Sequence, residues 1–228
     1  QAKANQLGIP VITNMKAEEL IKDKNGRVVG VKATMDGNSY VYHAKGGVVL
    51  ATGGFGANAK MVAKYNPEID SRFKTTDAPG TTGEALYMAQ RAGAQLVNMQ
   101  YIQTYPICDP ISGVIELIAD ARFDGAILLN QKGKRFVEEL DRRDVISKAI
   151  LAQPGAYAWV LWNDKIGSVS NTVKEHANEY DVFTKQGIMK TCDDLKCIAE
   201  FTKIPYDSLK GTIDRVDSMT GKGNDKDF

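Results

Sequence analysis

The first fifty residues alternate apolar and polar positions in a pattern that predicts a small antiparallel meander over residues 9–50. The strongest signal is Asn25-Gly26 between two apolar runs, because this dipeptide favours a tight hairpin turn. Asp36-Gly37 predicts a second turn. The expected strands of this meander, which follow a helical segment at residues 1–7, cover residues 9–12, 18–21, 28–33 and 39–44.

The run Gly47-Val48-Val49-Leu50-Ala51 has no polar position. A uniformly apolar run is typical of a strand that is buried on both faces of a parallel sheet. Thr52-Gly53-Gly54 follows it, and glycines at the carboxyl end of such a strand let the backbone approach a nucleotide closely. The alternative is an ordinary tight turn, because the chain has no G-x-G-x-x-G sequence for a pyrophosphate.

Helical and strand-like patterns alternate after residue 55, so the fold class that we expect is α+β. Polar residues that favour helix starts predict caps at Asn58, Thr82, Asp144 and Asp193. In the C-terminal part, the spacing of Leu209, Ile213 and Val216 predicts one apolar stripe along a helix. The other expected elements are helices at 58–65, 82–93 and 145–151, and strands at 95–105, 125–130 and 156–163.

Composition and charge exclude several classes of protein. Lys and Arg total 29 and Asp and Glu total 28, so the net charge is +1. This balance does not favour a nucleic-acid partner, and no apolar run reaches the roughly 18 residues that cross a bilayer. Three cysteines do not make a disulfide framework. Cys192 and Cys197 are five apart, which is not a standard metal-ligand spacing, so we expect no metal site, and Cys108 is expected to be a small, partly buried hydrophobe.

Arginines beside carboxylates supply the candidate chemistry. Arg122 follows Asp120, and Arg143 precedes Asp144. Such arginines are most often salt-bridged at the surface. The alternative is a proton relay, in which an arginine, a poor acid at its normal pKa, is reprotonated by charged neighbours in a dry pocket. Asp120 and Arg122 would form that relay if they fold beside Arg143, and Tyr105 is either a pocket residue or an ordinary half-buried tyrosine.

A colinear set of motifs resembles the flavoprotein subunits of the fumarate reductase/succinate dehydrogenase superfamily, in particular the flavocytochrome c-type fumarate reductases. The resemblance covers nearly the whole chain, and the order of the motifs makes it specific. The motifs are Val48-Val49-Leu50-Ala51-Thr52-Gly53-Gly54-Phe55, Pro79-Gly80 with Thr82-Gly83-Glu84, Met99-Gln100-Tyr101-Ile102-Gln103, Gly125-Ala126-Ile127-Leu128, Gly133-Lys134-Arg135-Phe136-Val137, Arg143-Asp144, Ala149-Ile150-Leu151-Ala152-Gln153 and the closing Gly221-Lys222-Gly223-Asn224-Asp225-Lys226-Asp227-Phe228.

The resemblance implies a two-domain, FAD-dependent oxidoreductase that acts on CH–CH groups. Residues 1–57 would be part of the FAD-binding domain, and residues 58–228 would form a mobile capping domain. In this family, N5 of the reduced flavin passes a hydride to a C=C bond and a cap arginine protonates the neighbouring carbon. Arg143 matches that arginine and Arg122 matches the relay arginine, with Asp120 beside it. The implied cofactor-binding residues are Ala51, Thr52, Gly53, Gly54, Thr82 and Gly83.

The chain departs from the fumarate reductase pattern where a substrate carboxylate would bind. Tyr105 stands where those enzymes carry His, and Asp120 replaces their Thr-Glu. This pair suits a hydrogen-bonding ring, as in the urocanate reductase branch, so we expect a urocanate-like 2-enoate as the small-molecule unsaturated carboxylate. The alternatives are a fumarate reductase, another flavin oxidase or dehydrogenase of the superfamily, and a non-catalytic cap module.

The resemblance also implies an electron-donor domain or protein, carrying haem or FMN, outside this chain. The helix already under way at residues 1–7 and the polar segment 221–227 favour the interpretation that both ends lie inside a larger protein. The family's dinucleotide-binding glycines would precede Gln1, and its remaining substrate-binding His and Arg would follow Phe228. We therefore expect the chain by itself to be colourless and inactive.

Overall fold

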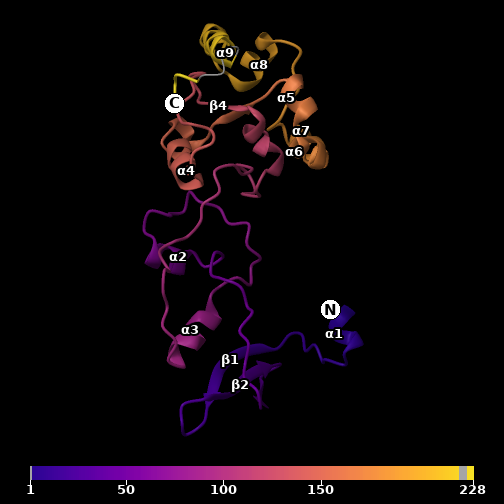
Figure 1. Cartoon of the computed structure of the whole chain (residues 1–228), viewed down its shortest axis with the longest axis vertical. Helices are drawn as coiled ribbons and strands as arrows, with labels where there is room; N and C mark the ends of the chain where they lie inside the picture. Colours follow the sequence, from indigo (N-terminus) through magenta and orange to yellow (C-terminus); the bar gives the residue numbers. More distant parts are fainter. Residues whose placement is uncertain (1, 221–224) are drawn as a thin grey trace. The chain divides into compact units, whose positions relative to one another are not determined.

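The computed structural model describes residues 2–220 and 225–228, in two compact units (Figure 1). Unit 1 is Gln1–Ile102 and unit 2 is Gln103–Phe228. Helices and separate antiparallel sheets occur together, which confirms the α+β class. Over the described ranges, no helix has the length and apolarity that a membrane span requires. The domain boundary expected after residue 57 falls inside unit 1, so the compact units divide later in the chain than the expected domains.

The meander of unit 1 forms as expected from its two turns. β1 (Lys16–Lys22), β2 (Val28–Met35) and β3 (Asn38–His43) form an antiparallel sheet in chain order. In the first turn, Asp23 accepts a backbone hydrogen bond from Gly26 at 3.0 Å. In the second turn, Asp36 and Gly37 both have positive φ, at 50° and 79°. Two consecutive positive φ values fit the twist of the flanking strands, so this turn fixes the register of β2 against β3.

Unit 1 has three helices, α1 (Ala2–Gln6), α2 (Ala59–Tyr65) and α3 (Glu84–Arg91), in its described part. Asn58 caps α2 as expected, because its side-chain oxygen accepts from the Met61 amide at 3.0 Å. The residue before α3 is Gly83 rather than the expected cap Thr82. Gly83 has φ +80°, and a Cβ there would lie 2.6 Å from Met61 Sδ and 2.8 Å from Phe55 Cβ. Close packing between α2 and the start of α3 therefore requires a glycine at this position.

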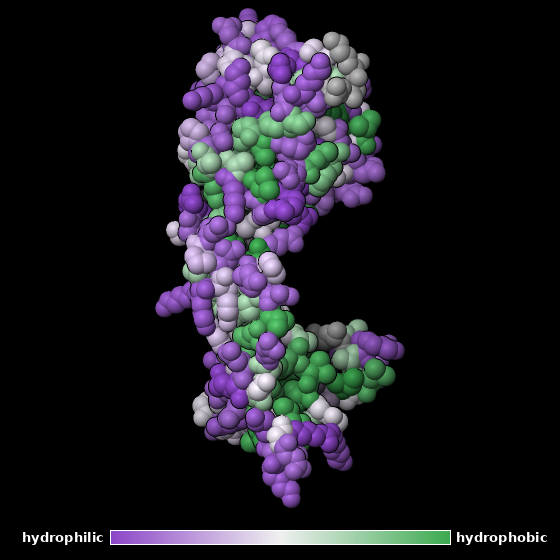
Figure 2. Space-filling model, turned by 60° about the vertical axis from the view of Figure 1, so that its left-hand side comes forward, coloured by the Kyte–Doolittle hydropathy of each residue, from purple (hydrophilic) through white to green (hydrophobic). Residues whose placement is uncertain are grey.

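Three expected strands do not form: residues 9–12, 47–51 and 95–105 have no strand structure. The expectation for 47–51 as a buried strand is wrong here, because Val49 is 89% exposed and no described strand lies beside it. An apolar run becomes a central strand only where neighbouring strands meet its backbone and sheet faces are covered. Figure 2 shows apolar side chains gathered on the surface of unit 1. The exposed large apolar residues of unit 1 include Leu7, Ile9, Val11, Ile12, Val41, Tyr42, Val49 and Leu50.

Unit 2 is built around a two-stranded antiparallel sheet, β4 (Ile127–Leu129) and β5 (Trp159–Leu161). Successive side chains of β4 enter two different cores, as strand geometry requires. Leu128 belongs to a cluster with Ile107, Ala119, Val137 and Ile146. Its neighbours Ile127 and Leu129 pack instead with Ile204 and Leu209. The surrounding helices are η1 (Leu117–Asp124), α4 (Arg143–Leu151), η2 (Pro154–Ala156), α5 (Asp164–Val169), α6 (Asn171–Glu175), α7 (Ala177–Gln186), α8 (Leu195–Thr202) and α9 (Tyr206–Thr220).

The apolar stripe expected in the last helix is confirmed. Leu209 is fully buried on α9, and Ile213 and Val216 pack against the same cluster. The polar loop expected at the end of the chain lies in part outside the described residues, since the structure describes Asp225–Phe228 but not residues 221–224. Arg135 of unit 2 pairs with Asp225 at 2.7 Å, so the described end of the chain packs on this unit.

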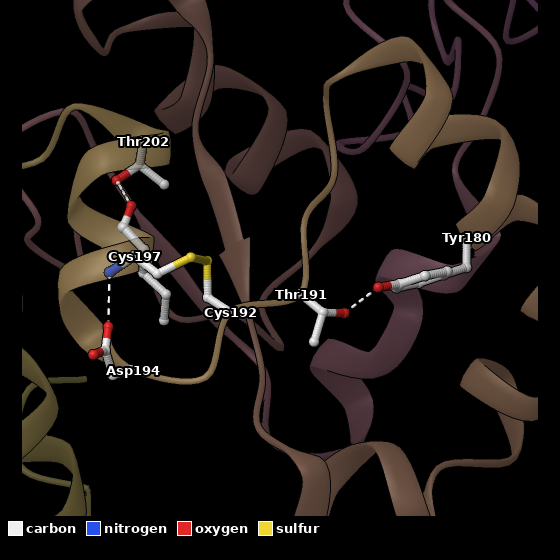
Figure 3. Close-up of a disulfide and its surroundings, with 7 residues drawn as sticks. Tyr180, Thr191, Cys192, Asp194, Cys197 and Thr202 are labelled. Atoms are coloured by element: carbon white, nitrogen blue, oxygen red, sulfur yellow. Dashed lines mark hydrogen bonds between the residues drawn. A yellow bond between two sulfur atoms is a disulfide. The ribbon is translucent and has the colours of Figure 1, made fainter.

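Cys192 and Cys197 form a disulfide, with 5.5 Å between their Cα atoms (Figure 3). The bridge joins the loop after α7 to the first turn of α8. Asp194, not the expected Asp193, caps α8 by accepting from the Cys197 amide at 2.8 Å. The odd number of cysteines and the five-residue spacing predicted neither a disulfide framework nor a metal site. They gave no indication of this single short-range disulfide. Cys108 is half-buried as expected, and the described residues contain no cluster of three or more potential metal ligands.

Candidate active site

Tyr105 is the residue around which the expected catalytic side chains of unit 2 gather. Its ring packs against the cluster that contains Ile107 and Ile146. The Arg143 guanidinium lies over that ring, with 5.0 Å between its central carbon and the ring centroid. This is the geometry of a cation–π contact. The Tyr105 hydroxyl is buried and has no hydrogen-bond partner among the residues that the structure describes.

Asp120 and Arg122 come from the 3₁₀ helix η1, which unit 2 places next to Tyr105. Arg122 Nε lies 3.5 Å from Asp120 Oδ1, and the two side chains are 2% and 18% exposed. Arg122 also donates from Nη1 to the carbonyl oxygen of Glu139 at 2.7 Å, and its guanidinium stacks on the Phe123 ring at 4.1 Å. The alternative of a surface salt bridge is therefore wrong for Arg122, which is a buried cation with a carboxylate beside it.

The electrostatics of the Tyr105 phenol connect the four expected residues. Burial is the main cause that raises the pKa of Tyr105, and the nearby Asp120 carboxylate adds to it. The positive charges of Arg122 and Arg143 act in the opposite direction. Because the balance favours the neutral phenol, Tyr105 presents an O–H group that is both a donor and an acceptor. Tyr105, Asp120, Arg122 and Arg143 thus form one cluster, called the Tyr105 cluster below.

Arg143 is the first residue of α4, so the helix begins before the expected cap Asp144. The neighbouring Arg142 pairs with Asp144 at 3.0 Å, and both side chains are at least half exposed. Arg142 is therefore a salt-bridged surface arginine, as the alternative interpretation of the sequence expects. Arg143 is also exposed in this structure, although its guanidinium contacts Tyr105. An arginine that is to act as an acid therefore needs an additional surface to exclude water.

Several buried oxygens of unit 2 lack hydrogen-bond partners in the described residues. Asp120 Oδ1 and Tyr105 Oη are two of them, and Thr104 Oγ1 and Ser147 Oγ are two more. An unsatisfied buried polar group costs about 1–3 kcal/mol, so a ligand that pairs with it binds favourably. Sequence reasoning missed Thr104 and Ser147. The only available signal was the spacing of four residues from Arg143, which puts Ser147 on the same helix face.

The segment expected to hold the cofactor, Ala51–Gly54, belongs to unit 1. It is exposed, and no described residue forms a hydrogen bond with its backbone amides. Gly53 has φ +77°, and open space surrounds Gly54 where a Cβ would stand. Free amides and room for a close approach fit a phosphate-bearing cofactor such as FAD. Thr82 and Gly83 say less about cofactor binding, because each has a structural role. The Thr82 hydroxyl donates to the Glu84 carboxylate, and packing against Met61 and Phe55 requires a glycine at position 83.

Comparison with known proteins gives one consistent family. The family model described as "FAD binding domain" matches residues 1–227. Urocanate reductase of Eggerthella lenta is 39% identical over 96% of this chain, and fumarate reductase (cytochrome) of Shewanella frigidimarina is 36% identical over 94%. The structure of the open conformation of a flavocytochrome c3 fumarate reductase matches all of this chain with a TM-score of 0.75 and 28% identity. The chain covers 37%, 36% and 39% of these three proteins, little more than a third of each.

Proposed function

Because the chain belongs to the FAD binding domain family, we propose that it is the substrate-protonating part of an FAD-dependent reductase for a urocanate-like 2-enoate. The observation that carries the proposal is the pair of buried oxygens of Tyr105 and Asp120 beside two arginines, with no geometrically satisfactory hydrogen bond to these oxygens from the described residues. Similarity to urocanate and fumarate reductases supports the oxidoreductase class and FAD as cofactor. The electron donor of the whole protein, a haem or FMN domain or protein, is part of the same proposal.

The substrate preference follows from the charge of Asp120. An imidazole ring offers N–H groups to the Asp120 carboxylate and to the Tyr105 hydroxyl, so both oxygens gain a hydrogen-bond donor. The second carboxylate of fumarate would instead face Asp120, and two like charges at short range repel. Tyr105 and Asp120 are therefore the substrate-binding residues of the proposal. The 39% identity with a urocanate reductase supports this assignment.

The proposed chemistry needs a cofactor, a proton donor and a relay. When bound, FAD supplies the hydride that adds to one carbon of the C=C bond. Arg143 gives a proton to the other carbon, so the product is the saturated acid, and Asp120 and Arg122 return a proton to Arg143. Ala51–Gly54 would hold the cofactor. Because Arg143 is exposed, we propose that residues 58–228 act as a capping domain that closes over the substrate and excludes water.

Turnover of the flavin-loaded, full-length protein with reduced viologen as the electron donor tests the substrate. We expect kcat/KM for urocanate to exceed that for fumarate by about 10- to 100-fold, the value of one or two satisfied buried polar groups. Acrylate and cinnamate-type acids, which lack ring N–H groups, should rank below urocanate. A preference for fumarate in the unmodified protein would contradict the proposed role of Asp120 and Tyr105.

Two substitutions test the roles within the Tyr105 cluster. Tyr105→His should shift the preference toward fumarate, because a cationic side chain then faces the second carboxylate. Arg143→Lys should lower kcat by about 100-fold or more with little change in KM, the expected loss for a proton donor. Unchanged selection in Tyr105→His would remove Tyr105 from the pocket, and full activity of Arg143→Lys would remove the proposed acid.

A further inference from the structure

Glu139 is a buried acid of unit 2 that none of the motifs above singles out as functional. Its carboxylate accepts hydrogen bonds from Arg135 Nε at 2.9 Å and from Arg135 Nη2 at 2.5 Å. It also accepts from the Leu128 amide of β4 at 3.0 Å. The side chains of Arg135 and Glu139 are 7% and 5% exposed. This two-pronged pair therefore fixes the Glu139 side chain to the central strand of the unit.

The main chain of the same residue holds the relay arginine. The Glu139 carbonyl oxygen accepts from Arg122 Nη1 at 2.7 Å, and this is the shortest contact that Arg122 makes to a described acceptor. Only three residues separate Glu139 from Arg143, the first residue of α4. The position of Glu139 thus sets both the direction of the Arg122 side chain and the starting point of the segment that leads to Arg143.

A buried ion pair is weak support for stability as such, because the cost of removing two charges from water offsets their attraction. Donating hydrogen bonds to the Glu139 carboxylate raises the pKa of Arg135, so this partner stays charged. Arg135 also pairs with Asp225 at 2.7 Å, and its guanidinium lies 5.0 Å from the Phe228 ring centroid. The pair is thus clamped between β4 and the end of the chain, an arrangement better suited to fixing geometry than to adding stability.

We propose that the Glu139–Arg135 pair is a positioning unit for Arg122: it holds the Glu139 carbonyl where it orients the guanidinium of the proton relay. The inference rests on the proposed function for its catalytic consequence only. The proposal places neither residue on the substrate, and Glu139 contacts the Tyr105 cluster through its carbonyl bond to Arg122, so both act through Arg122. The geometric part of the proposal applies to the chain whatever reaction the whole protein performs.

The first test measures Arg122 itself in the 228-residue chain. The ¹⁵Nε–H signal of this buried side chain is assigned by its loss in Arg122→Lys, and its hydrogen exchange is recorded by NMR. Glu139→Gln should speed that exchange by about 10-fold or more, because the side chain then opens more often. Arg135→Lys, which keeps the positive charge but loses the two-pronged geometry, should act in the same direction. Glu138→Gln is the matched control, because the Glu138 carboxylate accepts only from the Leu140 amide at 3.2 Å in the described contacts.

The second test measures catalysis in the flavin-loaded, full-length protein. Glu139→Gln should lower kcat by about 10- to 100-fold, the effect expected of a misplaced catalytic group, with KM changed by less than about 3-fold. In an Arg122→Lys background the same substitution should have little further effect on kcat. Such non-additivity is the sign of a residue that acts through another.

The two tests separate the failure of this inference from failure of the proposed function. An Arg122 exchange rate that is unchanged in Glu139→Gln and in Arg135→Lys would overturn the inference. Additive losses of kcat in the double variant would overturn it as well, because they indicate a general structural role. If Arg143→Lys keeps full activity while Glu139→Gln still frees Arg122, the proposed function fails and the positioning of Arg122 stands.

Discussion

The two units of the chain differ in how they bury their apolar side chains. In unit 2, β4 and its surrounding helices enclose two clusters, and residues such as Ile118, Ile146 and Leu209 have no exposed surface. In unit 1, β3 is exposed along its whole length and Val49 is 89% exposed. The apolar content of a segment therefore predicts burial only where other elements arrive to cover it.

The difference also applies to the candidate residues of each unit. The Tyr105 cluster lies on a packed core, where side chains such as Arg122 have fixed partners. The backbone amides of Ala51–Gly54 donate to no described residue, so a cofactor would supply the missing contacts. The candidate side chains of unit 2 are therefore held by protein contacts, whereas the candidate cofactor-binding backbone of unit 1 is exposed.

The largest expected effect is a direct test of this contrast with two leucines. Leu209→Ala in unit 2 should cost about 3–4 kcal/mol of unfolding free energy, because it leaves a cavity in a closed core. Leu7→Ala in unit 1 is the matched control, and at 62% exposure it should cost less than about 0.5 kcal/mol. Urea unfolding measures both. Equal losses would show that unit 1 has a core of its own around Leu7.

A smaller effect is expected within unit 1, at two glycines with positive φ. Gly83→Ala should cost about 2–3 kcal/mol, because backbone strain adds to the clash of the new methyl group with Met61 and Phe55. Gly53→Ala should cost about 1 kcal/mol from strain alone, since Thr81 is 3.7 Å away. Hydrogen exchange of the α2 and α3 amides reports these changes. If Gly53→Ala proves the more damaging to the free chain, the interpretation of Gly53 as an open cofactor position is wrong.

The disulfide should stabilise unit 2 alone. A bridge that closes a loop of about six residues contributes about 2 kcal/mol in the loop-entropy estimate, so Cys192→Ser with Cys197→Ser should lower the stability of unit 2 by that amount. Both tryptophans, Trp159 and Trp162, belong to unit 2, and their fluorescence follows its unfolding specifically. Reductant serves as the control, because it should weaken the unmodified chain and leave the double variant unaffected.

A further modest effect on stability is a pH dependence of the unfolding free energy of unit 2. Burial, with Asp109 and Glu179 nearby, raises the pKa of Glu116 to about 7. The folded state therefore keeps a proton that the unfolded chain loses above its ordinary pKa of about 4.5, and the stability of unit 2 should fall as the pH rises from 4.5 to 7. We expect a loss of about 1–2 kcal/mol, because Glu116 is partly open to solvent.

Glu116→Gln should remove this pH dependence. At pH 8 the variant should be more stable than the unmodified chain by about the same 1–2 kcal/mol. Tryptophan fluorescence during urea unfolding at pH 5 and pH 8 makes the measurement. Glu200→Gln, at an exposed position of α8, should leave the slope of stability against pH unchanged. A slope that persists in Glu116→Gln would assign the dependence to another group.

Local signals in the sequence were sufficient for elements that stabilise themselves. The turns at Asn25-Gly26 and Asp36-Gly37 defined the meander, Asn58 was the observed cap of α2, and the stripe on α9 was buried as expected. The run at 47–51 was assigned wrongly, because a central strand depends on neighbours that its own residues do not specify. Three helix caps lie one or two residues from the expected position, at Gly83, Arg142 and Asp194, because neighbouring polar residues are equally suitable caps by sequence.

The candidate site was only partly predictable from the sequence. The resemblance to a family selected Tyr105, Asp120, Arg122 and Arg143, and the structure brings these four together. The same reasoning gave no sign of Glu139. Its buried partner Arg135 lies in the motif at 133–137, but the proposed positioning role depends on the Glu139 carbonyl oxygen, which no motif specifies. Backbone acceptors are the same in every residue type, so a sequence pattern cannot identify the one that a particular arginine uses.

The short connection from Glu139 to Arg143 has a further consequence for how such proteins tolerate change. Residues 140–142 lie before α4 and are not helical, so they connect Glu139 to Arg143 as a short loop. Consecutive Cα atoms are about 3.8 Å apart. One residue inserted into or deleted from this loop would therefore displace Arg143 from the Tyr105 ring, while every side chain of the cluster remained in the sequence. The proposed reaction thus depends on the length of the loop 140–142 as much as on the identity of the Tyr105 cluster residues. Homologous chains with a different loop length should not be assumed to share the proposed chemistry.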